Sequence, residues 1–286
     1  MKPPRFKYLA ARSAEEAVGH LERYSGSARL LAGGQSLIPL LNLRMARPDA
    51  LIDLATCPEL AYIRTESNWL AIGPMTRQSE AEQAEAVRRS CPLLAKALPF
   101  LGSPTIRNRG TIGGTLAHAD RVAELPGVAV ALGAEFVAQG PGGRRTIKAE
   151  DFFVADLTNA LNPDEMLREI RFPVADDKDA SAFVEANNRH HDLATVGVAV
   201  SLSMARGEPR AARLVAIGVG PVPTRMRRAE SRLLEGRLGE RDVEEAAELA
   251  FDEVDPQGDF HASADYRRRV LRNLVKRALQ TATAGA

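Results

Sequence analysis

The sequence predicts a protein of mixed helices and strands in two domains. Its 286 residues correspond to two domains of about 150 residues each. Apolar residues at helical spacing alternate with short runs rich in Val, Ile and Leu, a pattern typical of helices packed on sheets. The densest polar run lies at residues 176–179. We therefore expect the two domains to occupy residues 1–176 and 177–286.

The N-terminal part of the chain shows one capped helix and two short strands. Ser13 and Glu16 form a capping box that precedes apolar residues at helical spacing, which predicts a helix over residues 13–24. Apolar runs at residues 29–32 and 50–54 predict short buried strands. This alternation predicts a small unit of helices and strands at the N-terminus.

The middle and last parts continue the alternation. Residues 68–73 predict a strand, in which Trp69 is expected to lie in the core. Thr76 is expected to cap a helix to residue 86, and Pro92 to open another that ends near residue 100. The later elements are expected as a helix at 122–132, a strand at 134–138 with a hairpin turn at 140–143, strands at 195–204 and 212–219, and helices at 224–234, 240–254 and 263–281. The last third therefore predicts a small sheet with packed helices.

Charge and cysteine content exclude several classes of protein. The 38 basic and 37 acidic side chains leave no excess charge for binding a nucleic acid or a membrane surface. Cys57 and Cys91 are too few for a four-thiolate zinc or iron–sulfur site. No apolar run reaches the roughly 18 residues that span a bilayer, and the first residues lack the apolar core of a signal peptide. We therefore expect a cytoplasmic protein with no integral membrane segment, no nucleic-acid partner and no metal site of its own.

Two glycine pairs carry the strongest functional signal. Residues 32–36 and residues 111–115 each combine apolar residues, a Gly-Gly pair and a hydroxyl. Paired glycines allow positive φ and let backbone N–H groups converge on an anion. Two such loops together would suit the pyrophosphate of a dinucleotide. Two tight turns after strands would give the same pattern, so both interpretations stay open.

Competing nucleotide and hydrolase motifs are missing. No Gly-Lys pair occurs, which excludes a P-loop, and no G-x-G-x-x-G follows a predicted strand. Residues 34–38 lack the second glycine of a nucleophile elbow, and no H-E-x-x-H is present. We therefore predict no catalytic residue and no metal ligand in this chain.

The two glycine motifs resemble those of a known family. Residues 31–40 (LAGGQSLIPL), 106–114 (IRNRGTIGG) and 161–167 (LNPDEML) are similar to blocks in the FAD-binding medium subunits of molybdenum-containing hydroxylases. That family includes carbon monoxide dehydrogenase medium chains and the flavin domain of xanthine dehydrogenase, and the likeness covers nearly the whole chain. It implies an α+β fold, with a two-subdomain FAD-binding domain of the vanillyl-alcohol-oxidase (PCMH) type, split at about residues 1–56 and 57–176. A small C-terminal domain of a sheet and helices would follow.

The resemblance also implies which residues meet FAD. The cofactor would be noncovalent and lie in the cleft between the subdomains. The two glycine loops would hold the pyrophosphate, Asp120 and Glu124 would contact FAD hydroxyls, and other side chains would pack near the isoalloxazine. The expected cofactor-binding residues are Ala32, Gly33, Gly34, Gln35, Ser36, Leu37, Thr111, Ile112, Gly113, Gly114, Thr115, Ala117, Asp120, Glu124, Met166, Leu167 and Leu193.

Four positions depart from the usual pattern of that family. Thr115 stands where Asn or Ser is frequent, and Arg121 stands where Pro usually follows the Asp. Leu193 lies in a segment, residues 189–194, that often shields the flavin with an aromatic residue; shielding or a role in a strand core are both possible. Glu185 lies near a position frequently occupied by Lys. These departures affect the expected path and charge of the chain near the cofactor.

The resemblance implies an electron-transfer subunit and not the site of substrate hydroxylation. A molybdenum cofactor would lie in a large partner subunit, and iron–sulfur clusters in a small partner would pass electrons to FAD and on to an acceptor. The assembly would be a dimer of heterotrimers. Two alternatives stay open, a stand-alone flavin oxidoreductase of the same fold and a noncatalytic anion-binding assembly subunit.

Overall fold

A parallel sheet of three strands forms the N-terminal end of the molecule. The computed structural model describes residues 2–189 and 191–284, so His190 of the expected shielding segment lies outside the described residues. The strands are ordered β1-β3-β2, and both pairs are parallel. The elements of this end are β1 (Lys7–Ala10), α1 (Ala14–Tyr24), β2 (Ala28–Leu31), α2 (Leu37–Asn42) and β3 (Ala50–Asp53). The predicted helix at residues 13–24 is confirmed, because the Ser13 hydroxyl accepts a 3.1 Å hydrogen bond from the backbone N–H of Glu16.

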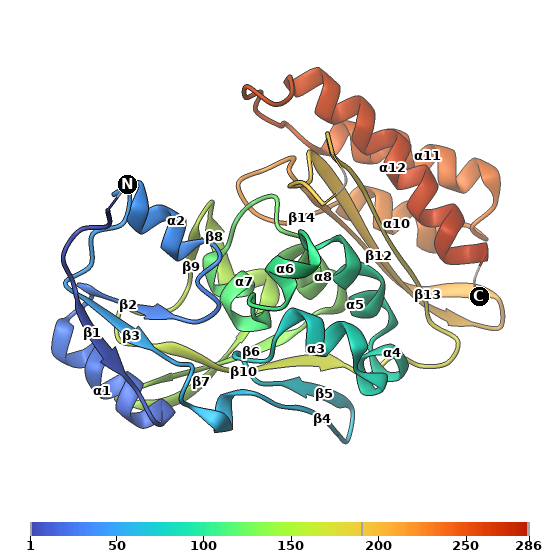
Figure 1. Ribbon diagram of the computed structural model, residues 1–286. Helices are drawn as coiled ribbons and strands as arrows, with labels where there is room; N and C mark the ends of the chain where they lie inside the picture. The colour runs from blue at the N-terminus through green and yellow to red at the C-terminus, as the bar shows by residue number, and fades with distance from the viewer. Residues whose placement is uncertain (1, 190, 285–286) are drawn as a thin grey trace.

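A five-stranded antiparallel sheet occupies the middle of the molecule (Figure 1). The strand order is β4-β5-β10-β6-β7, so the last strand in sequence lies at the centre. The strands are β4 (Ile63–Glu66), β5 (Trp69–Ile72), β6 (Glu135–Gly140), β7 (Gly143–Lys148) and β10 (Met166–Pro173). The helices that accompany them are α3 (Gln78–Gln83), α4 (Glu85–Ser90), α5 (Pro92–Ala97), α6 (Pro104–Arg107), α7 (Ile112–His118), α8 (Glu124–Leu132) and α9 (Ala149–Phe152), with the small β8 (Phe153–Ala155) and β9 (Thr158–Asn159) pair beside them.

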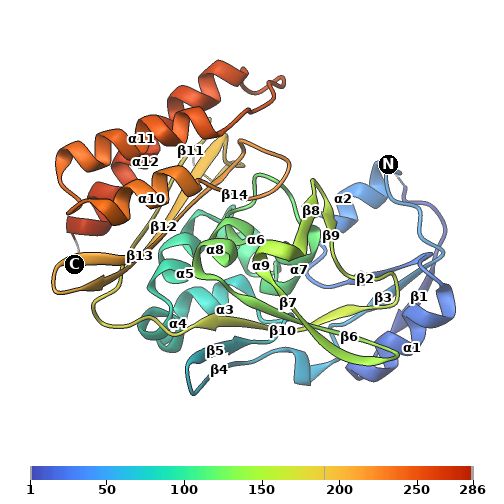
Figure 2. The same ribbon diagram turned by 180° about the vertical axis from the view of Figure 1, so that it is seen from behind.

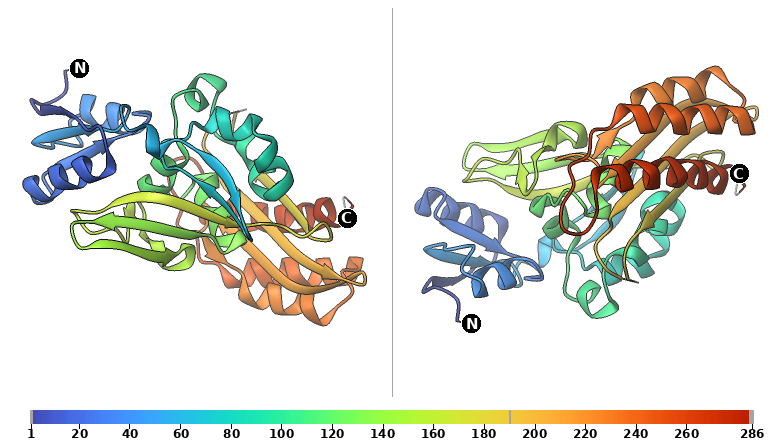
Figure 3. Two further views of the ribbon diagram at one scale, coloured as in Figure 1. Left: turned by 90° about the horizontal axis from the view of Figure 1, so that it is seen from below. Right: turned by 90° about the horizontal axis from the view of Figure 1, so that it is seen from above.

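The C-terminal part is a four-stranded antiparallel sheet with three helices on one face (Figure 2). It contains β11 (Ala180–Ala186), β12 (Val196–Ala205), β13 (Glu208–Ile217), β14 (Thr224–Arg225), α10 (Arg227–Glu235), α11 (Glu240–Glu253) and α12 (Ala264–Ala284). We call β11–β14 the C-terminal sheet. Figure 3 shows the N-terminal strands at one end of the molecule, the C-terminal helices at the other, and the five-stranded sheet between them.

The C-terminal sheet is buried on both faces. Val198, Val200 and Leu214 belong to the core formed with α10, α11 and α12. Their neighbours Val215 and Ile217 belong to the large core built around α8 and the five-stranded sheet. Alternate residues of a strand point to opposite faces, so one sheet contributes to two cores. The near-continuous Val, Ile and Leu runs of β12 and β13 follow from this burial on both sides.

Two local predictions in the middle of the chain were wrong. Thr76 does not cap a helix, because its hydroxyl donates to the carbonyl of Tyr62 at 2.9 Å and accepts from the N–H of Tyr62. The predicted helix is divided into α3 and α4 at Ala84, whose backbone is extended. Trp69 is only half-buried, because it is the first residue of β5 and pairs with Glu66 and Pro173 at the margin of the sheet.

Candidate functional site

The first glycine loop connects β2 to α2. Gly34 adopts φ +73°, a conformation that favours glycine over residues with a Cβ atom. Gly33 is buried, and a Cβ atom there would overlap the carbonyl oxygen of Arg109. The two glycines therefore have different roles, since Gly34 permits the turn and Gly33 permits close approach of another segment.

This loop presents a run of backbone donors. Among the described residues, none accepts a hydrogen bond from the N–H groups of residues 33–37. The loop's internal contact is the Gln35 side chain, whose Nε2 donates to the carbonyl of Gly33 at 3.0 Å. Consecutive N–H groups around a residue with positive φ form a concavity suited to an anion. The first loop therefore has the backbone geometry expected for binding an anion, and the binding itself stays a prediction.

The second glycine motif has a different structure from the one expected. Thr111 is the N-cap of α7, and its Oγ1 accepts a 3.0 Å hydrogen bond from the N–H of Gly114. The N–H groups of Ile112, Gly113 and Thr115 donate to the carbonyls of Thr76, Pro74 and Thr111. Neither glycine of the pair has a positive φ. The prediction that both loops turn free N–H groups toward one point is therefore wrong for residues 112–115.

The glycines of the second motif instead allow close packing. A Cβ atom on Gly113 would overlap the ring of Pro74, and one on Gly114 would lie 3.6 Å from the Cβ of Ala32. Ala32 belongs to the first loop, so the two motifs lie against each other although about 80 residues separate them. The two motifs lie close together, as the sequence interpretation expects. Among the described residues, the N–H groups of the first motif have no acceptor and those of residues 112–115 do.

The hydroxyl of Thr115 is hydrogen-bonded within the protein. Its hydroxyl accepts a 2.7 Å hydrogen bond from Nε2 of Gln78 and donates to the carbonyl of Thr111 at 3.3 Å. Gln78 is buried, and its Oε1 has no partner among the described residues. A buried side-chain oxygen without a partner is costly. Gln78 was given no role on sequence grounds, because its partner lies on α7, beyond the reach of local patterns.

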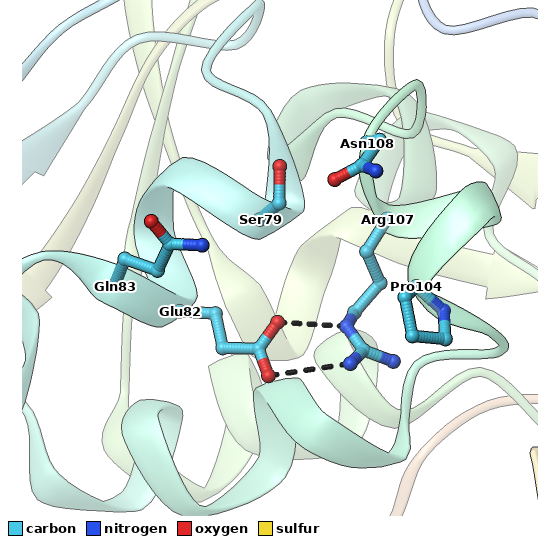
Figure 4. Close-up of a pocket in the computed structure, with 6 residues that line it drawn as sticks. All are labelled: Ser79, Glu82, Gln83, Pro104, Arg107 and Asn108. Atoms are coloured by element: carbon cyan, nitrogen blue, oxygen red, sulfur yellow. Dashed lines mark hydrogen bonds and ion pairs between the residues drawn. The ribbon is translucent and has the colours of Figure 1, made fainter.

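Arg107, the second residue of the IRNRGTIGG block, is a buried structural cation. It lines a pocket of about 400 Å³ together with Ser79, Glu82, Gln83, Pro104 and Asn108 (Figure 4). Its Nε donates to Glu82 at 2.8 Å, and Nη1 donates to the carbonyls of Pro99, Leu101 and Gly102. These hydrogen bonds join Arg107 to α3 and to residues 99–102. Arg107 therefore fixes the chain before the second glycine motif, a role that the sequence alone did not reveal.

Three carboxyl groups gather beyond α7. Glu124 is the first residue of α8 and is 6% exposed. Its pKa is raised to about 8 by burial, with further contributions from Glu185 and Asp120. Burial also raises the pKa of Glu185 to about 7, against a hydrogen bond from Asn187. Asp120 accepts a 3.0 Å hydrogen bond from the N–H of Val122 and so begins a turn that follows α7. Glu124 can therefore carry a proton near neutral pH.

The remaining expected residues lie in different surroundings. Met166 is buried in the N-terminal core and Leu167 in the large core, on opposite faces of β10. Leu193 is 63% exposed, which agrees with a residue open to a ligand better than with a strand core. The carbonyl of Ala117 accepts a 2.6 Å hydrogen bond from Asn159. Contact of these residues with FAD stays a prediction.

The residues that the structure describes lack a cluster of potential metal ligands. They contain no group of three or more His, Cys, Asp or Glu side chains that could hold a metal ion. No helix within the described part of the chain is long and apolar enough to cross a membrane. Cys57 and Cys91 are both buried and unpaired by disulfides. Burial is the main cause that raises the pKa of Cys57 to about 11 and of Cys91 to about 12.

Comparison with known proteins agrees with this geometry. Residues 4–175 match the family described as the FAD binding domain in molybdopterin dehydrogenase, and residues 181–282 match the CO dehydrogenase flavoprotein C-terminal domain. The 6-hydroxypseudooxynicotine dehydrogenase complex subunit alpha of Paenarthrobacter nicotinovorans is 39% identical, over 99% of this chain and 96% of that one. The carbon monoxide dehydrogenase medium chain of Hydrogenophaga pseudoflava is 37% identical, over 99% of both chains.

Solved structures show the same fold over the whole length. Carbon monoxide dehydrogenase from Hydrogenophaga pseudoflava superposes with a TM-score of 0.97 at 38% identity, covering 99% of both chains. Quinoline 2-oxidoreductase from Pseudomonas putida 86 superposes with a TM-score of 0.95 at 34% identity, covering 100% of this chain and 99% of that chain. The α+β architecture of an FAD-binding domain followed by a C-terminal domain is thereby confirmed. The chain belongs to the FAD-binding medium subunits of the molybdenum-containing dehydrogenase family.

Proposed function

We propose that the chain binds FAD noncovalently, with the pyrophosphate at the first glycine loop. The observation that carries this proposal is the run of N–H groups at residues 33–37 without acceptors among the described residues, around Gly34 at φ +73°. Gly114 and Ala32 pack together, so α7 supports this loop from behind. FAD supplies one- and two-electron redox chemistry when bound, and the protein binds and orients it.

The proposed site follows from these roles. Gly33, Gly34, Gln35, Ser36 and Leu37 would donate to phosphate oxygens, whereas Thr111, Ile112, Gly113, Gly114 and Thr115 would keep the loop in place. Glu124 and Asp120 would accept hydrogen bonds from FAD hydroxyls, because carboxylates accept from diols. Ala32, Ala117, Met166, Leu167 and Leu193 complete the proposed set as apolar contacts. The domains are proposed at residues 1–176, with subdomains at about 1–56 and 57–176, and at 177–286.

We further propose that the chain transfers electrons within a larger complex. Iron–sulfur clusters of a small partner subunit would deliver electrons, and a large partner would carry the molybdenum cofactor; two copies of this heterotrimer would form the complex in the cytoplasm. The two cysteines support this division, since thiols with a raised pKa are poor cluster ligands. The relatives named medium chain and complex subunit alpha point the same way.

The test is flavin retention by the purified full chain and by a pair of glycine variants. Gly33→Val should abolish flavin absorbance, because any Cβ atom there overlaps the Arg109 carbonyl. Gly19→Ala is the matched control, since nothing lies within 4 Å of a Cβ at that helical position. Equal flavin content in both variants would contradict the proposed site.

Three further outcomes separate the candidate functions. Co-purification with subunits that carry molybdenum and iron–sulfur clusters would support electron transfer in a complex. Turnover of a small substrate by the isolated yellow protein would favour a stand-alone oxidoreductase. A colourless chain that takes up no added FAD would favour the assembly subunit.

A further inference from the structure

A network of four charged side chains, Arg267, Asp259, Arg121 and Asp156, joins the C-terminal domain to the FAD-binding domain. Nη2 of Arg267, in the first turn of α12, donates to Oδ2 of Asp259 at 2.7 Å. Nη2 of Arg121, between α7 and α8, donates to the same oxygen at 3.0 Å. Nε of Arg121 lies 3.7 Å from Oδ2 of Asp156, in the turn between β8 and β9. The carboxylate of Asp259 is thus shared by one arginine from each domain.

Arg267, the buried member of this network, holds the residue that follows the segment of Leu193. Arg267 is only 2% exposed, and its Nη1 donates to the carbonyls of Thr195 and Gly218. Thr195 directly follows residues 189–194, the segment in which Leu193 lies. Gly218, at φ +75°, leaves no room for a Cβ beside Thr195. A buried guanidinium requires a counter-charge. Asp259 supplies that charge, so the position of Thr195 depends on Asp259.

Arg121 and Asp156, the other members of this network beside Asp259, hold the loop that carries Asp120. The N–H of Arg121 donates to Oδ1 of Asp156 at 3.1 Å, and the N–H of Leu157 donates to the carbonyl of Ala119 at 2.9 Å. From the other side, the N–H of Gly218 donates to the carbonyl of Arg121 at 3.0 Å. The loop is therefore clamped between the β8–β9 turn and the C-terminal sheet, one turn before Glu124.

From these contacts we infer that Asp259, through Arg121 and Arg267, is a positioning residue for the flavin site. It sets two segments at once, the loop of Asp120 and the segment of Leu193. The inference rests on the proposed function. The side chain of Arg121 allows the C-terminal domain to hold this loop, because it reaches Asp259.

The experiment uses the full chain and FAD, with three variants of the network and one control. Asp259→Asn removes the shared charge and leaves two guanidinium groups facing a neutral amide. Arg121→Met removes the link through Arg121, and Arg121→Lys restores a positive charge there. Asp255→Asn is the matched control, because Asp255 lies four residues away, has a side chain that is 97% exposed and pairs with Arg268 alone among the described residues.

The measurements are the Kd for FAD and the visible circular dichroism of bound flavin, normalised to the flavin bound. We expect Asp259→Asn and Arg121→Met to raise the Kd at least tenfold and to change the dichroism, and Arg121→Lys to recover most of both. The Kd for FAD and the dichroism of Asp255→Asn should equal those of the unchanged chain. If both network variants bind FAD within twofold of the unchanged chain and with the same dichroism, the inference is overturned, even where their melting temperatures fall. If the unchanged chain itself takes up no FAD, the proposed function is overturned instead.

Discussion

The buried carboxyl of Glu124 predicts how the free energy of unfolding depends on pH. Its folded-state pKa is about 8, against an ordinary value of 4.5. Between these two pH values the folded chain keeps a proton that the unfolded chain has lost, so the free energy of unfolding falls as pH rises. A difference of about 3.5 pH units, at about 1.4 kcal/mol each, gives at most about 5 kcal/mol. Local relaxation around the charged form lowers this cost, so we expect about 2–5 kcal/mol.

Glu124→Gln removes this loss because the amide has the shape of the protonated acid and does not titrate. We expect the variant, free of FAD, to lose less unfolding free energy from pH 5 to pH 8.5 than the unchanged chain, and the loss that remains to come from Glu185, whose pKa burial also raises. The unchanged chain should lose stability steadily over the same range. Urea unfolding at half-unit pH steps measures the difference, with Glu22→Gln, an exposed position of α1, as the control.

Addition of FAD extends the test to the proposed site. Hydroxyl groups that donate to the Glu124 carboxylate would favour its charged form and lower its pKa. Saturating FAD should therefore flatten the pH dependence of the unchanged chain and leave that of Glu124→Gln as it was. Parallel pH profiles for the two proteins without FAD would refute the reasoning, since they would show that burial of Glu124 does not govern its protonation.

Three further predictions concern the framework. Arg107→Met should lower the free energy of unfolding in urea by about 2–4 kcal/mol, because it leaves Glu82 and three carbonyl groups without their hydrogen-bond donor. The control Arg88→Met breaks an exposed pair with Glu85 and should lower it by less than about 1 kcal/mol. Equal losses in the two variants would contradict the structural role of buried Arg107. Gly113→Ala should lower the melting temperature and flavin content together, because the added methyl overlaps Pro74; an unchanged melting temperature would contradict the close packing. Ser13→Ala should lower the free energy of unfolding by about 1 kcal/mol, because the N-terminal cap of α1 is lost. An unchanged free energy of unfolding would contradict this role of Ser13.

Local signals in the sequence predicted the elements that depend on near neighbours. The Ser13 cap and the turn at Gly34 are properties of a few consecutive residues, so the pattern sufficed for them. The closeness of the two glycine motifs was also predicted, first because two such loops together would suit a pyrophosphate and then because they resemble known blocks. The overall architecture followed from the same source.

What the sequence did not reveal depends on distant neighbours. Whether Gly113 serves a turn or a packing contact is decided by Pro74, which belongs to a different segment. Thr76 pairs with Tyr62 across a strand connection and not with the following helix. The links of Arg107 to Glu82 and of Arg121 to Asp259 join segments 25 and 138 residues apart. No periodicity or capping rule carries such information.

The two-sided burial of the C-terminal sheet has a consequence for how the protein is made. A ribosome synthesises the chain from its N-terminus, so the glycine motifs emerge long before Val215 and Ile217, which fill the core around α8. Until those residues have left the ribosome, α8 exposes the apolar surface that they cover. We therefore expect nascent chains that end near residue 176 to bind chaperones and to capture FAD poorly. The ability to bind the cofactor would arise only when the last quarter of the chain is being translated.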